Sequence, residues 1–171
     1  MTTHLKTLIA IPGALILVAF GGWIHPPPRL IWNASASVPI GLYAVDPPRA
    51  PKVADLVVVS PPAPLAQFLA SRDYLPVGVP LLKHIGAVWG QTVCRYGSAV
   101  RIDGAPVGKA LASDRLGRLL PVWQGCLTLS AGQIFLFNQG VRDSFDGRYF
   151  GVISTSQILG LAHPVWTKTG R

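Results

Sequence analysis

The sequence predicts a mainly β domain that follows one N-terminal membrane segment. Of the 171 residues, 50% are hydrophobic and only 13% are charged, and the mean hydropathy of +0.41 is too high for an ordinary soluble domain. The 16 prolines and 18 glycines favour many turns and short strands over a helical bundle. About 150 residues remain after one membrane span, which is the usual size of a single folded domain.

The first element is the uncharged run LIAIPGALILVAFGGWI at residues 8–24, which is just long enough to span a bilayer. Lys6 precedes it, and Trp23 lies near its end, where an aromatic side chain prefers the interface. We expect an uncleaved transmembrane signal anchor of the inner membrane, with residues 1–7 as a short cytoplasmic tail and the remaining chain in the periplasm. One alternative is a buried core helix. The other is a cleavable signal peptide, because the Ala-Ser-Ala motif at residues 34–36 resembles a cleavage site.

The next segment, residues 25–32, contains three consecutive prolines and predicts a stiff stalk. Residues 33–171 then form the periplasmic domain. Its short apolar runs are rich in Val and Ile and are bounded by Pro, Gly and Asp-Gly turns such as the one at residues 103–104, which is typical of strands. We expect strands at Leu56–Val59, Leu81–Val88, Val100–Ile102, Ile134–Phe137 and part of Val152–Ile158, and one short helix at Leu65–Leu75.

The net charge of +8 comes from basic residues that are spread along the chain rather than clustered. This spread argues against nucleic-acid binding and favours an anionic lipid bilayer as the partner. Cys94 and Cys126 are the only cysteines, and an oxidising compartment would allow them to form a disulfide. The cysteines and histidines show no metal-ligand spacing, so we expect neither a metal nor a cofactor.

Ser37 is the first residue that suggests chemistry. It follows small side chains and precedes Val38-Pro39, so a proline restrains the backbone and a substrate chain has room to approach the hydroxyl. A nucleophile is one interpretation of this segment, and an ordinary turn is the other.

Lys83 is the second such residue, and it lies in the middle of an apolar, strand-like run. A lysine acts as a general base only when it is neutral, and burial lowers its pKa by disfavouring the ammonium form. The alternative is a lysine on the solvent face of a half-buried strand.

The densest polar cluster is RDSFDGRYFG at residues 142–151. Asp146 and Arg148 are spaced to pair with each other, and Ser144 can orient a lysine amine through a hydrogen bond. The alternative is a charged hairpin turn at Asp146-Gly147.

Together these segments resemble the type I signal peptidase family. The order is membrane anchor, Ser37-Val-Pro, Leu-Leu-Lys83, then Ser144-x-Asp146-x-Arg148-Tyr-Phe-Gly, and it covers the whole chain in outline. The chain departs from the common pattern at Gly147, where the family often has serine, and it lacks the methionine that usually follows the nucleophile. The short length and the lack of methionine are similar to the conjugative-transfer branch of that family.

The resemblance implies a signal-peptidase-like antiparallel β domain and a Ser-Lys dyad, with Ser37 as nucleophile and Lys83 as general base. It also implies that the Ser35 hydroxyl supports the oxyanion, that Ser144 orients Lys83, and that Asp146 and Arg148 brace their segment. His84 is excluded from the dyad, because neighbouring side chains of a strand point to opposite faces.

The conjugative branch implies a pilin precursor as the protein substrate, with a linear or a cyclic product, and allows docking of other conjugative transfer proteins. One alternative is a general type I signal peptidase that removes signal peptides from exported preproteins. The other is a non-enzymatic anchored scaffold of a secretion channel, in which Ser37 and Lys83 are only structural.

Overall fold

The structure, a computed structural model, describes residues 29–168. The membrane segment expected at residues 8–24 and the start of the stalk lie outside the described residues. Between residues 29 and 168, no helix has the length and apolar character needed to cross a membrane.

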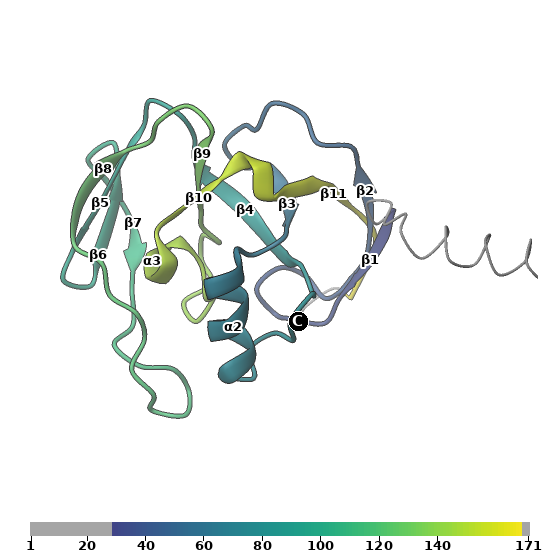
Figure 1. The fold of residues 1–171 in the computed structure, drawn as a ribbon, viewed down its shortest axis with the longest axis horizontal. Helices are drawn as coiled ribbons and strands as arrows, with labels where there is room; N and C mark the ends of the chain where they lie inside the picture. The colour runs from purple at the N-terminus through teal and green to yellow at the C-terminus, as the bar shows by residue number, and fades with distance from the viewer. Residues whose placement is uncertain (1–28, 169–171) are drawn as a thin grey trace, which may run out of the picture.

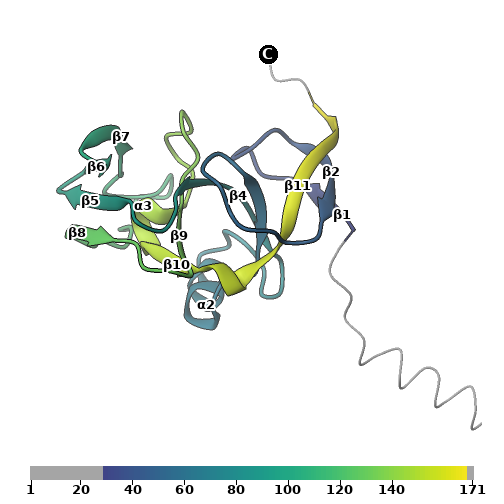
Figure 2. The same cartoon turned by 90° about the horizontal axis from the view of Figure 1, so that it is seen from above.

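The described chain forms two antiparallel sheets with few helical residues, as the sequence predicts (Figure 1). The larger sheet has the strand order β1-β2-β11-β3-β4-β9-β10, and the smaller has the order β7-β6-β5-β8. In both views the smaller sheet lies at one end of the domain, next to β9 and β10 (Figures 1 and 2). The strands are β1 (Leu30–Asn33), β2 (Gly41–Asp46), β3 (Leu56–Val59), β4 (Leu81–Ala87), β5 (Thr92–Tyr96), β6 (Ala99–Ile102), β7 (Ala105–Lys109), β8 (Gly125–Thr128), β9 (Gln133–Leu136), β10 (Val152–Ser154) and β11 (Ile158–Thr167).

The expected strands agree closely with β3, β4, β6 and β9, whose bounds differ by at most one residue at either end. The expected strand at Val152–Ile158 is instead β10, a 3-10 turn at Thr155–Gln157, and the start of the long strand β11. The stalk prediction for residues 25–32 is wrong at its end, because β1 begins at Leu30 and pairs with β2. Strands β1, β2, β5, β7 and β8 were not predicted, because none of them is a continuous Val- and Ile-rich run.

Residues 29–168 also contain two α-helices, α2 (Ala63–Ser71) and the single turn α3 (Gly147–Phe150). Helix α2 starts earlier and ends earlier than the expected Leu65–Leu75. Asp73 adopts a φ of +56°, a left-handed conformation that a right-handed helix does not accommodate, so the helix ends before it.

The smaller sheet contains both of its predicted local features. The residues at 103–104 form the two-residue turn between β6 and β7, and both have positive φ, as an Asp-Gly hairpin turn requires. Cys94 and Cys126 are directly opposite each other on β5 and β8 and form a disulfide.

Strand β4 lies inside the larger sheet, and its two faces belong to different core clusters. Leu82 packs with Val38 and Tyr43 on one face. Leu81 and Ile85 pack on the other face, in the cluster that also contains Leu69 of α2. Because side chains alternate along a strand, Lys83 shares the face of Leu81 and Ile85.

Candidate active site

Ser37 lies on the loop between β1 and β2, and Asn33 holds that loop in shape from within. The Asn33 side-chain amide donates hydrogen bonds to the carbonyl oxygens of Ser35, Val38 and Pro39, at 2.8, 3.1 and 3.0 Å. Its oxygen accepts hydrogen bonds from the backbone N–H and the hydroxyl of Ser35, both at 3.1 Å. The loop therefore has a defined conformation, with Ser37 half-buried on it.

Lys83 is buried on β4, with 4% of its surface exposed, so the alternative of a lysine on the solvent face is wrong. The pKa of Lys83 is lowered from 10.5 to about 8, chiefly because burial disfavours the ammonium form; the charge of Asp146 opposes this shift, that of Arg148 adds to it, and that of Asp143 opposes it. The Lys83 amine donates a 2.9 Å hydrogen bond to the Ser144 hydroxyl. A substantial fraction of Lys83 is thus neutral near pH 8.

Asp146 and Arg148 form a buried ion pair next to the segment that carries Ser144. The Asp146 carboxylate is fully buried and accepts hydrogen bonds from the Arg148 guanidinium at 2.9 and 3.0 Å. Asp146 also caps the start of α3 by accepting the Arg148 backbone N–H, so the hairpin-turn alternative for residues 146–147 is wrong. Arg148 donates to the Ser144 carbonyl oxygen at 2.9 Å, which fixes the segment that presents the Ser144 hydroxyl.

Gly147 has a physical reason to differ from the serine that is common in related motifs. A Cβ atom at this position would lie 2.5 Å from the Phe135 ring and 2.7 Å from the Leu136 carbonyl oxygen. Real Cβ atoms essentially never approach other atoms so closely. The packing of β9 against α3 therefore leaves no room for a side chain here.

Asn138 belongs to this cluster, although sequence analysis did not single it out. It directly follows Phe137, the last residue of the apolar run that overlaps β9, and is 1% exposed. Its amide donates to the Ser37 carbonyl oxygen at 2.7 Å and, in a longer contact, to the Ser144 hydroxyl at 3.4 Å. A polar residue directly after a buried strand was the signal that could have identified it.

The Ser37 and Lys83 side chains are connected through this network rather than by a direct hydrogen bond in the described part of the chain. The Ser37 hydroxyl lies 2.9 Å from the Ser35 hydroxyl, and either can be the donor. Asn138 joins the Ser37 backbone to Ser144, and Ser144 receives the Lys83 amine. Catalytic hydrogen bonds commonly tighten only when substrate is bound, so this arrangement is compatible with a dyad.

His84 makes contacts outside this pair. Its backbone N–H donates to the Asn138 side-chain oxygen at 2.9 Å, and its ring Nδ1 lies 3.3 Å from the same atom. The His84 ring thus reaches Asn138 rather than Ser37 or Lys83 in the residues that the structure describes.

Strand β4 is open on one side before His84, whose backbone N–H and carbonyl oxygen are bonded to Asn138 and Phe137. It pairs with β3 along residues 81–84, whereas β9 pairs with β4 only at Ile85 and Ala87. The part of β4 that carries Leu82 and Lys83 therefore has no strand neighbour on the β9 side within residues 29–168. An extended peptide can add to such an edge through backbone hydrogen bonds.

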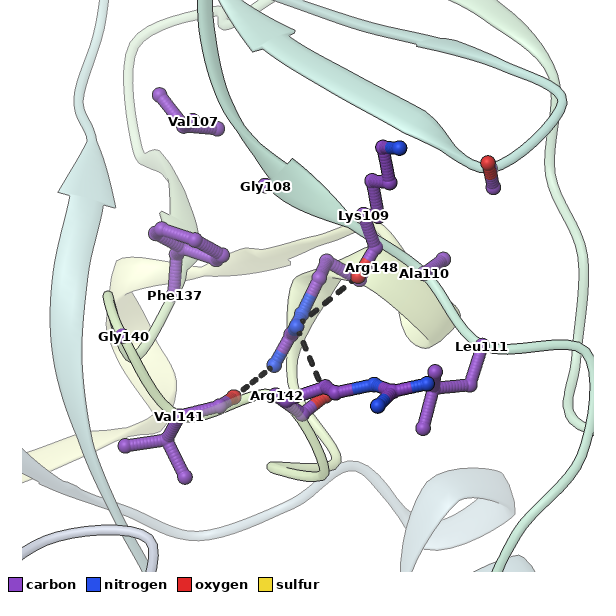
Figure 3. A pocket seen from close by; sticks show the side chains of 11 residues that line it. Val107, Gly108, Lys109, Ala110, Leu111, Phe137, Gly140, Val141, Arg142 and Arg148 are labelled. Carbon is purple, nitrogen blue, oxygen red and sulfur yellow. Dashed lines mark hydrogen bonds between the residues drawn. The ribbon is translucent and has the colours of Figure 1, made fainter.

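A cavity of about 420 Å³, lined in part by Arg148, lies between β7 and the loop before α3 (Figure 3). Arg148 forms part of its wall and donates to the carbonyl oxygens of Lys109, Arg142 and Val141, at 3.1, 3.1 and 2.8 Å. Neither Ser37 nor Lys83 lines this cavity. Across residues 29–168, no group of three or more His, Cys, Asp or Glu side chains is arranged to hold a metal ion.

Comparison with known proteins identifies one family along nearly the whole chain. The family model described as signal peptidase, peptidase S26, matches residues 1–167. Conjugal transfer protein TraF of Agrobacterium fabrum (strain C58 / ATCC 33970) is 34% identical over 169 residues, which cover 93% of this chain and 90% of the relative. Probable conjugal transfer protein TraF of Sinorhizobium fredii (strain NBRC 101917 / NGR234) is 37% identical over 171 residues, with 93% and 85% coverage.

A solved structure of a signal peptidase I from Enterococcus faecalis V583 aligns with 66% of this chain and 97% of that chain. The sequence identity is 17% and the TM-score is 0.39.

Proposed function

The chain belongs to the signal peptidase family, peptidase S26, and from that membership we propose that it is a membrane-anchored serine endopeptidase that processes a conjugative pilin precursor. The observation that carries the proposal is the buried Lys83, whose amine is held by the Ser144 hydroxyl and whose pKa is lowered to about 8. A buried lysine with no carboxylate bonded to its amine is costly for stability and useful for proton transfer.

The proposed reaction is acyl transfer by a Ser-Lys dyad. Neutral Lys83 takes the hydroxyl proton of Ser37, and the Ser37 oxygen attacks the carbonyl carbon of the scissile peptide bond. The tetrahedral intermediate collapses, the C–N bond breaks, and the Lys83 ammonium gives its proton to the departing amine. The acyl-enzyme ester on Ser37 is then cleaved by water, which gives a linear product, or by the amino group of the precursor itself, which gives a cyclic one.

The developing oxyanion needs donors near Ser37. We assign this role to the Ser37 backbone N–H and the Ser35 hydroxyl, which lies next to the nucleophile in the loop that Asn33 holds. Loss of one such donor commonly costs about 3 kcal/mol of transition-state stabilisation.

The open edge of β4 supports binding of an extended substrate. A peptide that pairs with the backbone of Leu82 would run past the Lys83 amine and the Ser37 loop, because Asn138 connects that loop to this region. Backbone pairing of this kind is largely independent of side chains, so specificity would come from pockets for alternate residues.

The substrate class follows from the resemblance to the conjugative branch of the family, and relatives that are named conjugal transfer proteins support it. We propose a pilin precursor in the same membrane as the substrate, with the anchor at residues 8–24 in the inner membrane and the domain in the periplasm. An anchor raises the encounter rate by confining enzyme and substrate to one plane.

The test is mass spectrometry of a candidate pilin precursor co-expressed with this protein. The wild type is compared with Ser37→Ala, with Lys83→Ala and with the control Gln124→Ala, which changes an exposed residue directly before β8. A mass loss with the wild type and the control, but with neither active-site variant, would support the dyad. An additional deficit of one water would mean cyclisation.

The family description itself favours one second function, a general signal peptidase. Ordinary exported preproteins with A-x-A cleavage sites distinguish the two functions. Efficient cleavage of such a panel would contradict the pilin-specific proposal. Conjugative transfer that survives both Ser37→Ala and Lys83→Ala would instead support a scaffold.

A further inference from the structure

Asn138 lies where the loop that carries Ser37 meets the segment that carries Ser144. Its amide donates to the Ser37 carbonyl oxygen at 2.7 Å and to the Ser144 hydroxyl at 3.4 Å. Among the hydrogen bonds of residues 29–168, the one to Ser37 is the only one that joins loop 34–40 either to β4 or to segment 137–146.

The orientation of the Asn138 amide follows from its third partner. The backbone N–H of His84 can only donate, so the atom 2.9 Å from it must be the amide oxygen. The NH₂ group then points the other way, with two hydrogens for two acceptors, Ser37 and Ser144. The Asn138 backbone N–H donates to the Asp146 carboxylate at 3.2 Å, which anchors the residue itself.

Asn33 does not position the Ser37 loop relative to β4. Its hydrogen bonds are confined to residues 35, 38 and 39, so they maintain the shape of the loop without placing it relative to β4. The apolar contact of Val38 with the cluster of Leu82 holds the loop against the opposite face of β4 from Lys83, and such packing has no fixed direction.

We propose that Asn138 is a positioning residue that fixes the position of Ser37 relative to Lys83. It hydrogen-bonds both the Ser37 carbonyl oxygen and the Ser144 hydroxyl, which in turn orients the Lys83 amine. This inference rests on the proposed roles of Ser37 and Lys83. Asn138 touches neither the attacking oxygen nor the base nitrogen, and it acts only through the Ser37 backbone and the Ser144 hydroxyl. A displacement of about 1 Å between reacting groups can lower a rate about 100-fold.

The discriminating variant is Asn138→Asp. It keeps the volume and the acceptor for the His84 N–H, but it replaces the donor to the Ser37 carbonyl with a second acceptor. The probe is p-nitrophenyl acetate with the full chain in detergent, and the readouts are release of p-nitrophenolate and the mass of the protein acetylated at Ser37. Gln124→Ala is the matched control, because it removes a side-chain amide that also bonds backbone, at Gly97 in the turn between β5 and β6.

The rate constants are compared on the high-pH plateau, where Lys83 is neutral in every variant. The comparison is made there because a new carboxylate near Lys83 adds to the charges of Asp143, Asp146 and Arg148 and changes the lysine pKa. On the plateau, we expect Asn138→Asp to lower the acylation rate constant about 100-fold and Asn138→Ala at least about tenfold, with the KM for the ester nearly unchanged. A wild-type plateau rate for Asn138→Asp would overturn the proposal. It would mean that the enzyme needs only the contact with the His84 N–H, and not the hydrogen bond to the Ser37 carbonyl.

Hydrogen exchange tests the role of Asn138 without depending on the proposed catalytic activity. Backbone amides of residues 34–38 and 40 should exchange faster in Asn138→Ala than in the wild type, and unchanged exchange would overturn the positioning role even if Asn138→Asp does not fold. If the wild type is not acetylated at Ser37, the proposed function fails, whereas this comparison still tests Asn138.

Discussion

Lys83 and Ser144, which are 61 positions apart in the sequence, meet in a 2.9 Å hydrogen bond inside the domain. The amine of a buried lysine has few partners, and here its partner is a neutral hydroxyl rather than a carboxylate. This choice matters, because a carboxylate bonded to the amine would favour the ammonium form and raise the pKa.

The acylation rate should rise with pH through about 8. The lowered pKa of Lys83 means that the amine is neutral above about pH 8 and protonated, hence inactive as a base, below it. Acetylation of Ser37 by p-nitrophenyl acetate, followed from pH 6 to 10, measures this profile. A rate that is flat across this range would contradict a lysine base.

Ser144→Ala should lower the plateau rate about tenfold, because the amine then loses the acceptor that orients it. The same assay measures it. Ser156→Ala, on an exposed residue, is the control and should keep the wild-type rate. A wild-type rate for Ser144→Ala would mean that packing alone orients Lys83.

Lys83→Met should stabilise the protein at neutral pH. The pKa of Lys83 is lower in the folded state, so between about pH 8 and 10.5 the unfolded chain binds more protons and the stability of the wild type rises with pH. Below pH 8 the full penalty of the buried ammonium applies, and it is on the order of 3 kcal/mol. Urea unfolding at pH 7 and pH 10.5 should show a gain that shrinks at the higher pH, and an equal gain at both would contradict this cause.

Arg148→Lys should destabilise the domain severely. The Asp146 carboxylate is fully buried, and a lysine cannot reproduce the two hydrogen bonds that the guanidinium makes with it. Breaking a buried pair commonly costs about 3–5 kcal/mol of unfolding free energy. In the same urea experiment, Arg49→Lys at the exposed pair with Asp55 should change stability by less than about 1 kcal/mol.

Gly147→Ser should destabilise the domain although related motifs often carry serine there. Its Cβ would overlap the Phe135 ring and the Leu136 carbonyl oxygen, and overpacking of a core commonly costs about 1–3 kcal/mol. The change in thermal midpoint measures this cost, with Ala105→Ser on the exposed hairpin as the control. An unchanged midpoint would mean that β9 and α3 move apart readily.

The site could be predicted in part because several of its residues interrupt an expected pattern. Lys83 lies within an apolar run, and Ser144, Asp146 and Arg148 form the densest polar segment in the chain. The burial of Lys83 could not be predicted, since alternation alone places a lysine on a solvent face as readily as on a core face. Asn138 was missed because one asparagine after a strand is an ordinary turn signal until its partners are known.

By itself, the sequence determined the mainly β class, the strands that are continuous Val- and Ile-rich runs, and the family, because these depend on local composition and on the order of motifs along the chain. Only the tertiary structure decided that Lys83 is buried, that Asp146 begins a helical turn, that Gly147 has no room for a side chain, and that Asn138 links Ser37 to Ser144. The physical reason is that burial, hydrogen-bond partners and steric room are set by segments up to 101 residues apart, whose approach no local pattern encodes.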